Sequence, residues 1–366
     1  MASPSSGTKL DGQHTLVRVL DEGGMSIVWL AEHGGLGKQV AVKILRAEQV
    51  ERDPSLASRF VVGAEAASKV GHPHLVSLVA HGTTDAGAPW LSMERLEGMS
   101  LRARLELGAD SGRPRARVPL SYALAVLEQA AQALDAAHAA GLAHLALSPA
   151  KLFVTDAGGA PFVKLFGLGL GKLVDPTRPG GTSTALPYLA PEQLVGAASV
   201  DAGADVWALA VMAYELLTGQ RPFSGANASA LYVATVTSTP AAPSTYDPGL
   251  GPAVDALFTR AFARSASARF GSAGELARAL VAALTGGSAT VAVAPVPQLY
   301  GESPKPTAPT PGPALVSSPA TSPPPEPASP SSGRRLMAAV GGVTVAVILG
   351  LRVIAPAMPA ASGTLV

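Results

Sequence analysis

The strongest constraint on the fold of this chain is a change of hydrophobic periodicity near residue 97. Before this point, short stretches rich in β-branched residues are separated by turn residues, a pattern typical of strands. These stretches read HTLVRVL, SIVWLAEH, QVAVKIL, LVSLVAHG and PWLSMER. One helix is expected among them, at residues 54–70, with Asp53 as its N-cap and Pro54 in its first turn.

After residue 97, apolar residues recur at helical spacing. The segment SYALAVLEQAAQALDAAHAAG predicts a long helix with Ser121 as its cap and Gly141 beyond its end. A second helix is expected in DAGADVWALAVMAYELLTG and stops at Gly219, and others fit PAVDALFTRAF and SAGELARALVAAL. The sequence therefore predicts an α+β domain over residues 10–285, with a strand-rich lobe (10–97) before a larger helical lobe (98–285).

The C-terminal part of the sequence has a different character. Residues 286–335 are rich in Pro, Ser and Ala, which predicts an extended linker. Residues 336–358 are long and apolar enough for a transmembrane helix, and Arg352 lies near enough to one end to snorkel. The alternative, a buried core helix, is disfavoured by the linker before it. Arg334 and Arg335 favour a single-pass plasma (inner) membrane protein with a cytoplasmic domain and a short outer tail, 359–366.

Composition excludes several classes of function. The chain has 27 basic and 26 acidic residues, and no basic cluster that would predict nucleic-acid binding. It has no cysteine, which excludes disulfides and thiolate chemistry. Hydrophobic residues make up 48%, enough for a sizeable core. Residues 1–9 are polar, are expected to be disordered and lack the apolar core of a secretory signal peptide.

A series of short motifs in the globular part resembles the eukaryotic-like Ser/Thr protein kinases of bacteria. In chain order they are VAVK (40–43), HPHLV (72–76), MERLEG (93–98), HLALSPAKLFV (144–154), VKLFGLGLGK (163–172), APEQL (190–194), DVWALAVMAYELLTGQRPF (205–223) and Arg269. The resemblance covers about three quarters of the chain and implies the bilobal protein-kinase-like fold.

The resemblance also implies a nucleotide cleft. Lys43 aligns with the family's phosphate-binding lysine, although a solvated strand lysine is an equally good interpretation. The other nucleotide-binding positions would be Leu20, Gly23, Val28, Ala41, Met93 and Phe153. The glycine-rich loop keeps only its middle glycine, Gly23, and Asp21 places a carboxylate where phosphates would lie. The carboxylate should weaken the binding of an anion.

The positions that the family uses for chemistry differ here. The catalytic base aligns with Ala146 and the phosphoryl-stabilising lysine with Ser148. The two metal-binding positions align with Lys151 and Gly167, and the helix glutamate that orients the strand lysine aligns with Gly63. Leu145 replaces the arginine before the base. These substitutions predict a degenerate, pseudokinase-like site with no catalytic residues and no metal ligands.

Lys151 has two interpretations. It replaces the metal and supports ATP binding without magnesium, or it is a solvated loop lysine, which is the favoured of the two. Thr182, Ser183 and Thr184 fall in the activation-segment region, where a partner kinase would phosphorylate them, but ordinary polar loop composition is the favoured explanation. The insertion 108–117 is expected to be a solvated loop, with contact to anionic lipid as the alternative.

The residues that the family uses for structure are kept. His144 opens the catalytic loop, and Asp205 aligns with the aspartate that holds the backbone of this loop. Glu192 and Arg269 align with the buried ion pair of the larger lobe, and Trp207 fits the core of that lobe. His138 is expected to be structural. The pattern indicates that the domain folds whether or not it transfers phosphate.

Three functions follow from these observations. The leading hypothesis is a membrane-anchored pseudokinase that serves as a scaffold or allosteric regulator of a cytoplasmic partner, such as an active kinase. The second is a weak or unconventional ATP-dependent serine/threonine protein kinase. The third is a nucleotide-binding switch without transfer.

Overall fold

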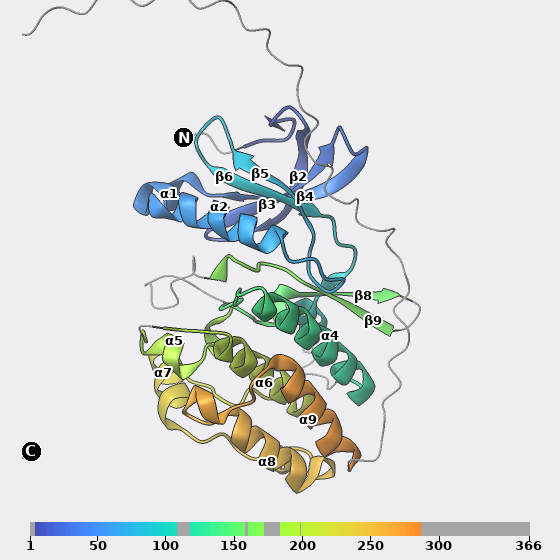
Figure 1. Ribbon diagram of the computed structural model, residues 1–366, viewed down its shortest axis with the longest axis vertical. Coiled ribbons are helices and arrows are strands. Elements are labelled where there is room, and N and C mark those ends of the chain that lie inside the picture. Colours follow the sequence, from blue (N-terminus) through green and yellow to red (C-terminus); the bar gives the residue numbers. More distant parts are fainter. Residues whose placement is uncertain (1–3, 108–117, 158–159, 172–183, 198, 287–366) are drawn as a thin grey trace, which may run out of the picture. The chain divides into compact units, whose positions relative to one another are not determined.

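The computed structural model describes residues 4–107, 118–157, 160–171, 184–197 and 199–286, all within one compact unit, Met1–Leu299 (Figure 1). The predicted linker beyond Gly286, the predicted membrane helix and the outer tail lie outside the described residues. The insertion 108–117, Thr182 and Ser183 lie outside them too. Within the described ranges, no helix combines the length and hydropathy needed to cross a bilayer.

The N-terminal lobe contains a six-stranded antiparallel sheet in the order β1-β2-β3-β4-β6-β5. Its strands are β1 (Lys9–Leu10), β2 (His14–Glu22), β3 (Ser26–His33), β4 (Lys38–Leu45), β5 (Leu78–Thr83) and β6 (Pro89–Glu94). The strands predicted from β-branched alternation are confirmed. One face of the sheet forms a small core around Leu16, Val42 and Trp90.

Two helices, α1 (Ala47–Arg52) and α2 (Ser55–Ser68), follow β4 (Figure 1). Helix α2 packs Leu56, Phe60 and Ala64 into a second cluster between itself and the sheet. The predicted N-cap is corrected by one residue. Pro54 occupies the cap of α2, and Asp53 accepts a hydrogen bond from the Ser55 N–H at 3.1 Å. Proline fits this position because it has no N–H to leave unpaired.

The C-terminal lobe is mostly helical (Figure 1). Its helices are α3 (Leu101–Glu106), α4 (Leu120–Ala139), α5 (Pro191–Leu194), α6 (Gly203–Thr218), α7 (Ala228–Thr237), α8 (Gly251–Ala261) and α9 (Ala273–Thr285). A small sheet, β7 (Met99–Ser100), β8 (Leu152–Ala157) and β9 (Ala160–Leu165), lies at the side facing the first lobe. Helix α6 is buried along nearly its whole length, as its continuous apolar sequence predicts.

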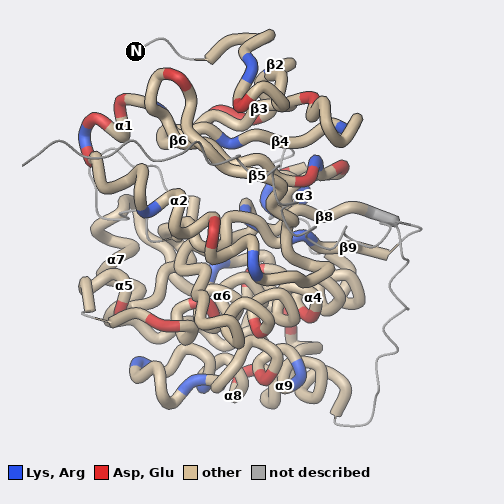
Figure 2. The backbone as a smooth tube through the Cα atoms, turned by 45° about the horizontal axis from the view of Figure 1, so that its top comes forward, with Lys and Arg blue, Asp and Glu red and all other residues tan. Residues whose placement is uncertain are grey.

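The structure confirms the predicted ends of α4 and α6 and corrects the predicted cap of α4. Helix α4 stops before Gly141 and α6 stops at Gly219, and both glycines have positive φ. A positive φ closes a helix at little cost only in glycine. Ser121 is not the cap of α4, because the helix begins at Leu120 behind Pro119. Helix α7, which has no charged residue and is plain tan in Figure 2, was not anticipated.

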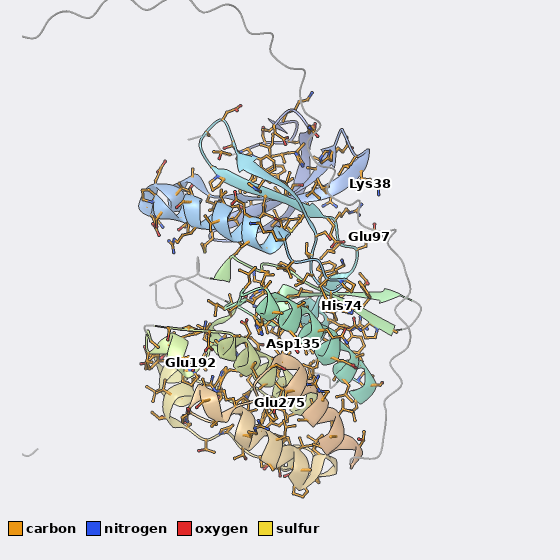
Figure 3. All side chains as sticks on the ribbon, viewed as in Figure 1. Lys38, His74, Glu97, Asp135, Glu192 and Glu275 are labelled. Atoms are coloured by element: carbon orange, nitrogen blue, oxygen red, sulfur yellow. The ribbon has the colours of Figure 1, made fainter. Side chains whose placement is uncertain are left out.

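The segment after α2 connects the two lobes. The Leu165 N–H donates to the His74 carbonyl at 2.8 Å, and the Val76 N–H donates to the Leu165 carbonyl at 3.0 Å. Lys164 pairs with Glu94 at 2.7 Å. His74, labelled in Figure 3, lies in this junction, and its Nδ1 lies 2.9 Å from the Val163 carbonyl. These contacts join the end of β6 and the loop after α2 to β9.

We expect Arg269→Ala to lower the free energy of unfolding by about 3 kcal/mol, since it leaves Glu192 without its bidentate partner. The two Arg269–Glu192 contacts measure 2.6 and 2.9 Å, and the Arg269 guanidinium also lies over the Trp207 ring. Chemical denaturation measures the change. The control is Arg102→Ala, since Arg102 pairs with Glu106 in solvent and should cost less than about 1 kcal/mol. Equal effects of the two variants would contradict the assignment.

Candidate functional site

The site lies where β2, β3 and β4 face the loop that follows α4. Lys43 stands in the middle of β4, opposite Val28 on β3 and Leu91 on β6. Its side chain is half-buried. Loss of hydration, followed by the like charge of Lys151, lowers the pKa of Lys43 to about 7, and Asp21 opposes the shift. The two lysines and Asp21 therefore share one electrostatic environment.

The turn between β2 and β3 is fastened to the start of α1. Arg46 Nε donates to the Gly23 carbonyl at 2.8 Å, and the Arg46 guanidinium pairs with Glu22 at 2.5 Å. Gln49 Nε2 donates to the Gly24 carbonyl at 3.1 Å. Met25, at the tip, packs on the cluster under α2. The predicted glycine-rich loop is thus held by contacts that motif reasoning missed.

The other predicted nucleotide-binding residues come from several strands. Ala41 on β4 is buried and pairs with Met93 on β6. Val28 and Phe153 are half-buried on β3 and β8, and Leu20 is exposed near the end of β2. The structure thus sets Ala41 beside Met93 and Val28 beside Lys43.

A separate cavity of about 90 Å³ lies elsewhere in the N-terminal lobe, beside Trp29, Ile44 and Glu48, and none of the predicted nucleotide-binding residues lines it. The assignment of the nucleotide cleft therefore stays a prediction from the motifs.

The carboxylate of Asp205 anchors the start of the loop after α4. Asp205, at the start of α6, accepts hydrogen bonds from the N–H groups of His144 and Leu145, both at 2.7 Å, and from His138 at 2.9 Å. Leu145 has φ +59°, a conformation that costs energy in a residue other than glycine. Asp205 stabilises this strained turn, as the sequence predicts, and thereby fixes Ala146 in a buried position.

Ser148 and Lys151 follow in the same loop. Ser148 is fully buried, and its hydroxyl finds no hydrogen-bond partner among the described residues. The Lys151 N–H donates to the Ser148 carbonyl at 2.8 Å, and Lys151 Nζ lies 5.2 Å from the centre of the Phe166 ring. Loss of hydration lowers the pKa of Lys151, while Asp21 favours its charged form.

Gly167 lies directly beside this lysine. A Cβ atom at Gly167 would be 3.7 Å from both Lys151 Cδ and His144 Nε2, and the glycine has φ +91°. The described residues contain no group of three or more histidine and carboxylate side chains able to hold a metal ion. Magnesium prefers carboxylate oxygens, whereas this cleft offers two ammonium groups and Asp21. Among the described residues, this donor set offers a divalent cation one carboxylate beside two lysines.

Comparison with known proteins identifies the family. Residues 14–267 match the model of the protein kinase domain. The chain is 38% identical over 278 residues to serine/threonine-protein kinase Pkn1 of Myxococcus xanthus, covering 75% of this chain and 38% of that protein. It is 33% identical over 291 residues to PknA of Mycobacterium tuberculosis, covering 78% and 64%. The chain therefore belongs to the protein kinase family, and it spans less than two thirds of the length of these relatives.

A solved structure supports the same assignment. The kinase domain of Mycobacterium tuberculosis PknI superposes with a TM-score of 0.62 at 28% identity, covering 77% of this chain and all of that one. The bilobal kinase fold predicted from the motifs is confirmed. The degenerate site and the membrane anchor stay predictions.

We expect the side-chain amine of Lys43 to titrate near pH 7, because lost hydration and the charge of Lys151 both disfavour its protonated form. NMR of the protein with isotope-labelled lysine measures the midpoint. Lys151→Met should move it upward by removing a like charge, whereas Lys9→Met, at an exposed site, should leave it unchanged. A midpoint near the usual ~10.4 would show that this amine is hydrated.

Proposed function

We propose that this protein kinase family member is a pseudokinase, anchored in the plasma membrane, that acts by binding a cytoplasmic partner and not by transferring phosphate. The observation that carries the proposal is the charge of the cleft. Lys151 stands at the position of one metal ligand of the family, and Gly167 stands beside it at the position of the other. Ala146, whose methyl group takes up no proton, aligns with the catalytic base.

Electrostatics supports this proposal. Phosphoryl transfer depends on neutralising the charge of the migrating group, chiefly by metal ions and by positioning of the acceptor hydroxyl. Two unit charges about 4 Å apart repel by about 4 kcal/mol at an effective dielectric near 20, and a divalent ion would be repelled about twice as strongly. Lys151 therefore disfavours the metal, and no described carboxylate besides Asp21 shares the electrostatic environment of the two lysines.

The same two lysines support nucleotide binding without magnesium. Lys43 would contact a phosphate of ATP from the sheet, and Lys151 would supply a fixed positive charge from the loop below it. Asp21 and the fastened β2–β3 turn oppose this binding, so the affinity is modest. Such a protein works as a nucleotide-responsive switch if ATP alters its partner binding, and as a plain scaffold if it does not.

The proposed location rests on the sequence beyond residue 286. An apolar segment at 336–358, preceded by Arg334 and Arg335, would hold the domain at the cytoplasmic face. A linker of the composition of residues 286–335, rich in Pro, Ser and Ala, would give the domain reach. Tethering raises the local concentration of the domain toward any partner at the same membrane. An active kinase is the partner that a catalytically silent kinase fold suits best.

A second candidate, an active serine/threonine protein kinase, is supported by the comparisons. Pkn1 and PknA bear the name of serine/threonine-protein kinases and resemble this chain over about three quarters of its length. Lys43 and Asp205 align with the family's phosphate-binding lysine and loop-anchoring aspartate, and Asp205 accepts hydrogen bonds from the loop N–H groups. An active enzyme of this kind would require the cleft to admit a divalent ion beside Lys151.

Phosphotransfer separates the two candidates. We expect the full-length protein, incubated with radiolabelled ATP and magnesium, to label neither itself nor a generic protein acceptor above the level of Lys43→Met. Transfer that requires Lys43 would establish the kinase and overturn the pseudokinase proposal. ATP should raise the melting temperature equally with magnesium and with EDTA, because the described residues of the cleft form no group of metal ligands. Stabilisation that appears only with magnesium contradicts metal-free binding.

Asp21→Asn should raise the affinity for ATP in EDTA about two- to fivefold, since it removes a carboxylate beside Lys43 and Lys151. Calorimetric titration measures the dissociation constant. Glu32→Gln is the matched control. Glu32 is exposed on β3, toward the end of the strand that lies away from Val28, the residue that pairs with Asp21. A lower affinity after Asp21→Asn would mean that the carboxylate assists the nucleotide.

A further inference from the structure

Residues 167–171 read Gly-Leu-Gly-Leu-Gly, and the two leucines enter different cores. Leu168 belongs to the large core of the C-terminal lobe. Leu170 belongs to the cluster of the N-terminal lobe, with Phe60 and Ala64 of α2. Both leucines are less than 10% exposed. This short segment therefore contributes apolar surface to both lobes at once.

The glycine between the leucines touches the backbone of α2. A Cβ atom at Gly63, in the middle of α2, would lie 2.1 Å from the Gly169 carbonyl oxygen. A Cβ atom at Gly169 would lie 2.2 Å from the Gly63 carbonyl oxygen. Real Cβ atoms do not approach a backbone oxygen so closely. The contact is reciprocal, and it exists only because both residues are glycine.

The last glycine touches the loop on the other side. A Cβ atom at Gly171 would lie 1.9 Å from the His144 carbonyl oxygen. The same histidine has its Nε2 atom 3.1 Å from the Phe166 carbonyl, just before the segment. His144 is itself fixed through its N–H by Asp205. The segment is thus packed between α2 above and the anchored loop below.

We propose that residues 167–171 form an interlobe lock that holds α2 against the loop at His144. The lock joins the lobes by two leucine anchors and by backbone contacts at Gly63–Gly169 and Gly171–His144. It also leaves no room for a side chain at Gly63, the position that aligns with the family's orienting glutamate. The proposal is independent of whether the protein binds ATP or transfers phosphate.

The lock predicts an unusual effect on stability for replacing a helix glycine, Gly63, by alanine. Glycine inside a helix is less stable than alanine because it loses more backbone freedom on folding. If Gly63 faced open space, Gly63→Ala would therefore stabilise α2. The lock predicts the opposite, since the new methyl group would force α2 and the segment 167–171 apart.

The test uses the full-length protein without ligand. Gly63→Ala should lower the melting temperature by several degrees and raise amide hydrogen exchange at least tenfold in peptides covering 167–171. Gly71→Ala is the matched control, because Gly71 follows α2, has no positive φ and would meet nothing within 4 Å. Gly71→Ala should change neither the melting temperature nor the amide exchange at 167–171. A higher melting temperature for Gly63→Ala, or unchanged exchange at 167–171, would overturn the lock.

Leu170→Ala provides a second test if Gly63→Ala does not fold. It keeps every glycine contact and removes only the anchor in the N-terminal lobe. It should raise amide exchange along α2, although the substitution lies about a hundred residues away in the sequence. Val62→Ala, on the exposed side of α2, is the control and should leave amide exchange along α2 unchanged. Exchange in α2 that is equal in both variants would refute the lock.

Discussion

The structure around the cleft depends on the carboxylate of Asp205. It lies at the start of α6, buried in the core of the C-terminal lobe, and accepts hydrogen bonds from the N–H groups of His144 and Leu145 and from the His138 side chain of α4. A buried carboxylate is costly unless its oxygens are paired, and here the backbone N–H groups pair them. These bonds fix the turn at Leu145 in spite of its positive φ.

This anchor serves structure whether or not the loop carries out chemistry. The same turn holds Ala146, which aligns with the family's catalytic base, in a buried position. Nothing in the hydrogen bonds of Asp205 requires a charged residue at position 146. The contacts that fix this turn therefore do not depend on the residue at position 146.

Sequence reasoning succeeded where the physical cause was local or carried by a motif. The strands followed from β-branched alternation, the ends of α4 and α6 from Gly141 and Gly219, and the role of Asp205 from its alignment. It failed where the cause was a contact between distant segments. Arg46 fastening the β2–β3 turn, and Gly63 meeting Gly169, are invisible in any window of the sequence. The small errors at the caps arose because a proline preceded each helix start.

The balance of charge between Lys43, Lys151 and Asp21 indicates what kind of ligand the site would favour. Two half-buried lysines near each other are unfavourable, and burial together with their mutual repulsion lowers the pKa of Lys43 to about 7. In a site with carboxylates at positions 146 and 167, these lysines would be neutralised from within. Here Asp21 is the carboxylate that acts on both. Among the described residues the site therefore has more positive than negative charge, and the proposed anionic ligand would relieve this imbalance.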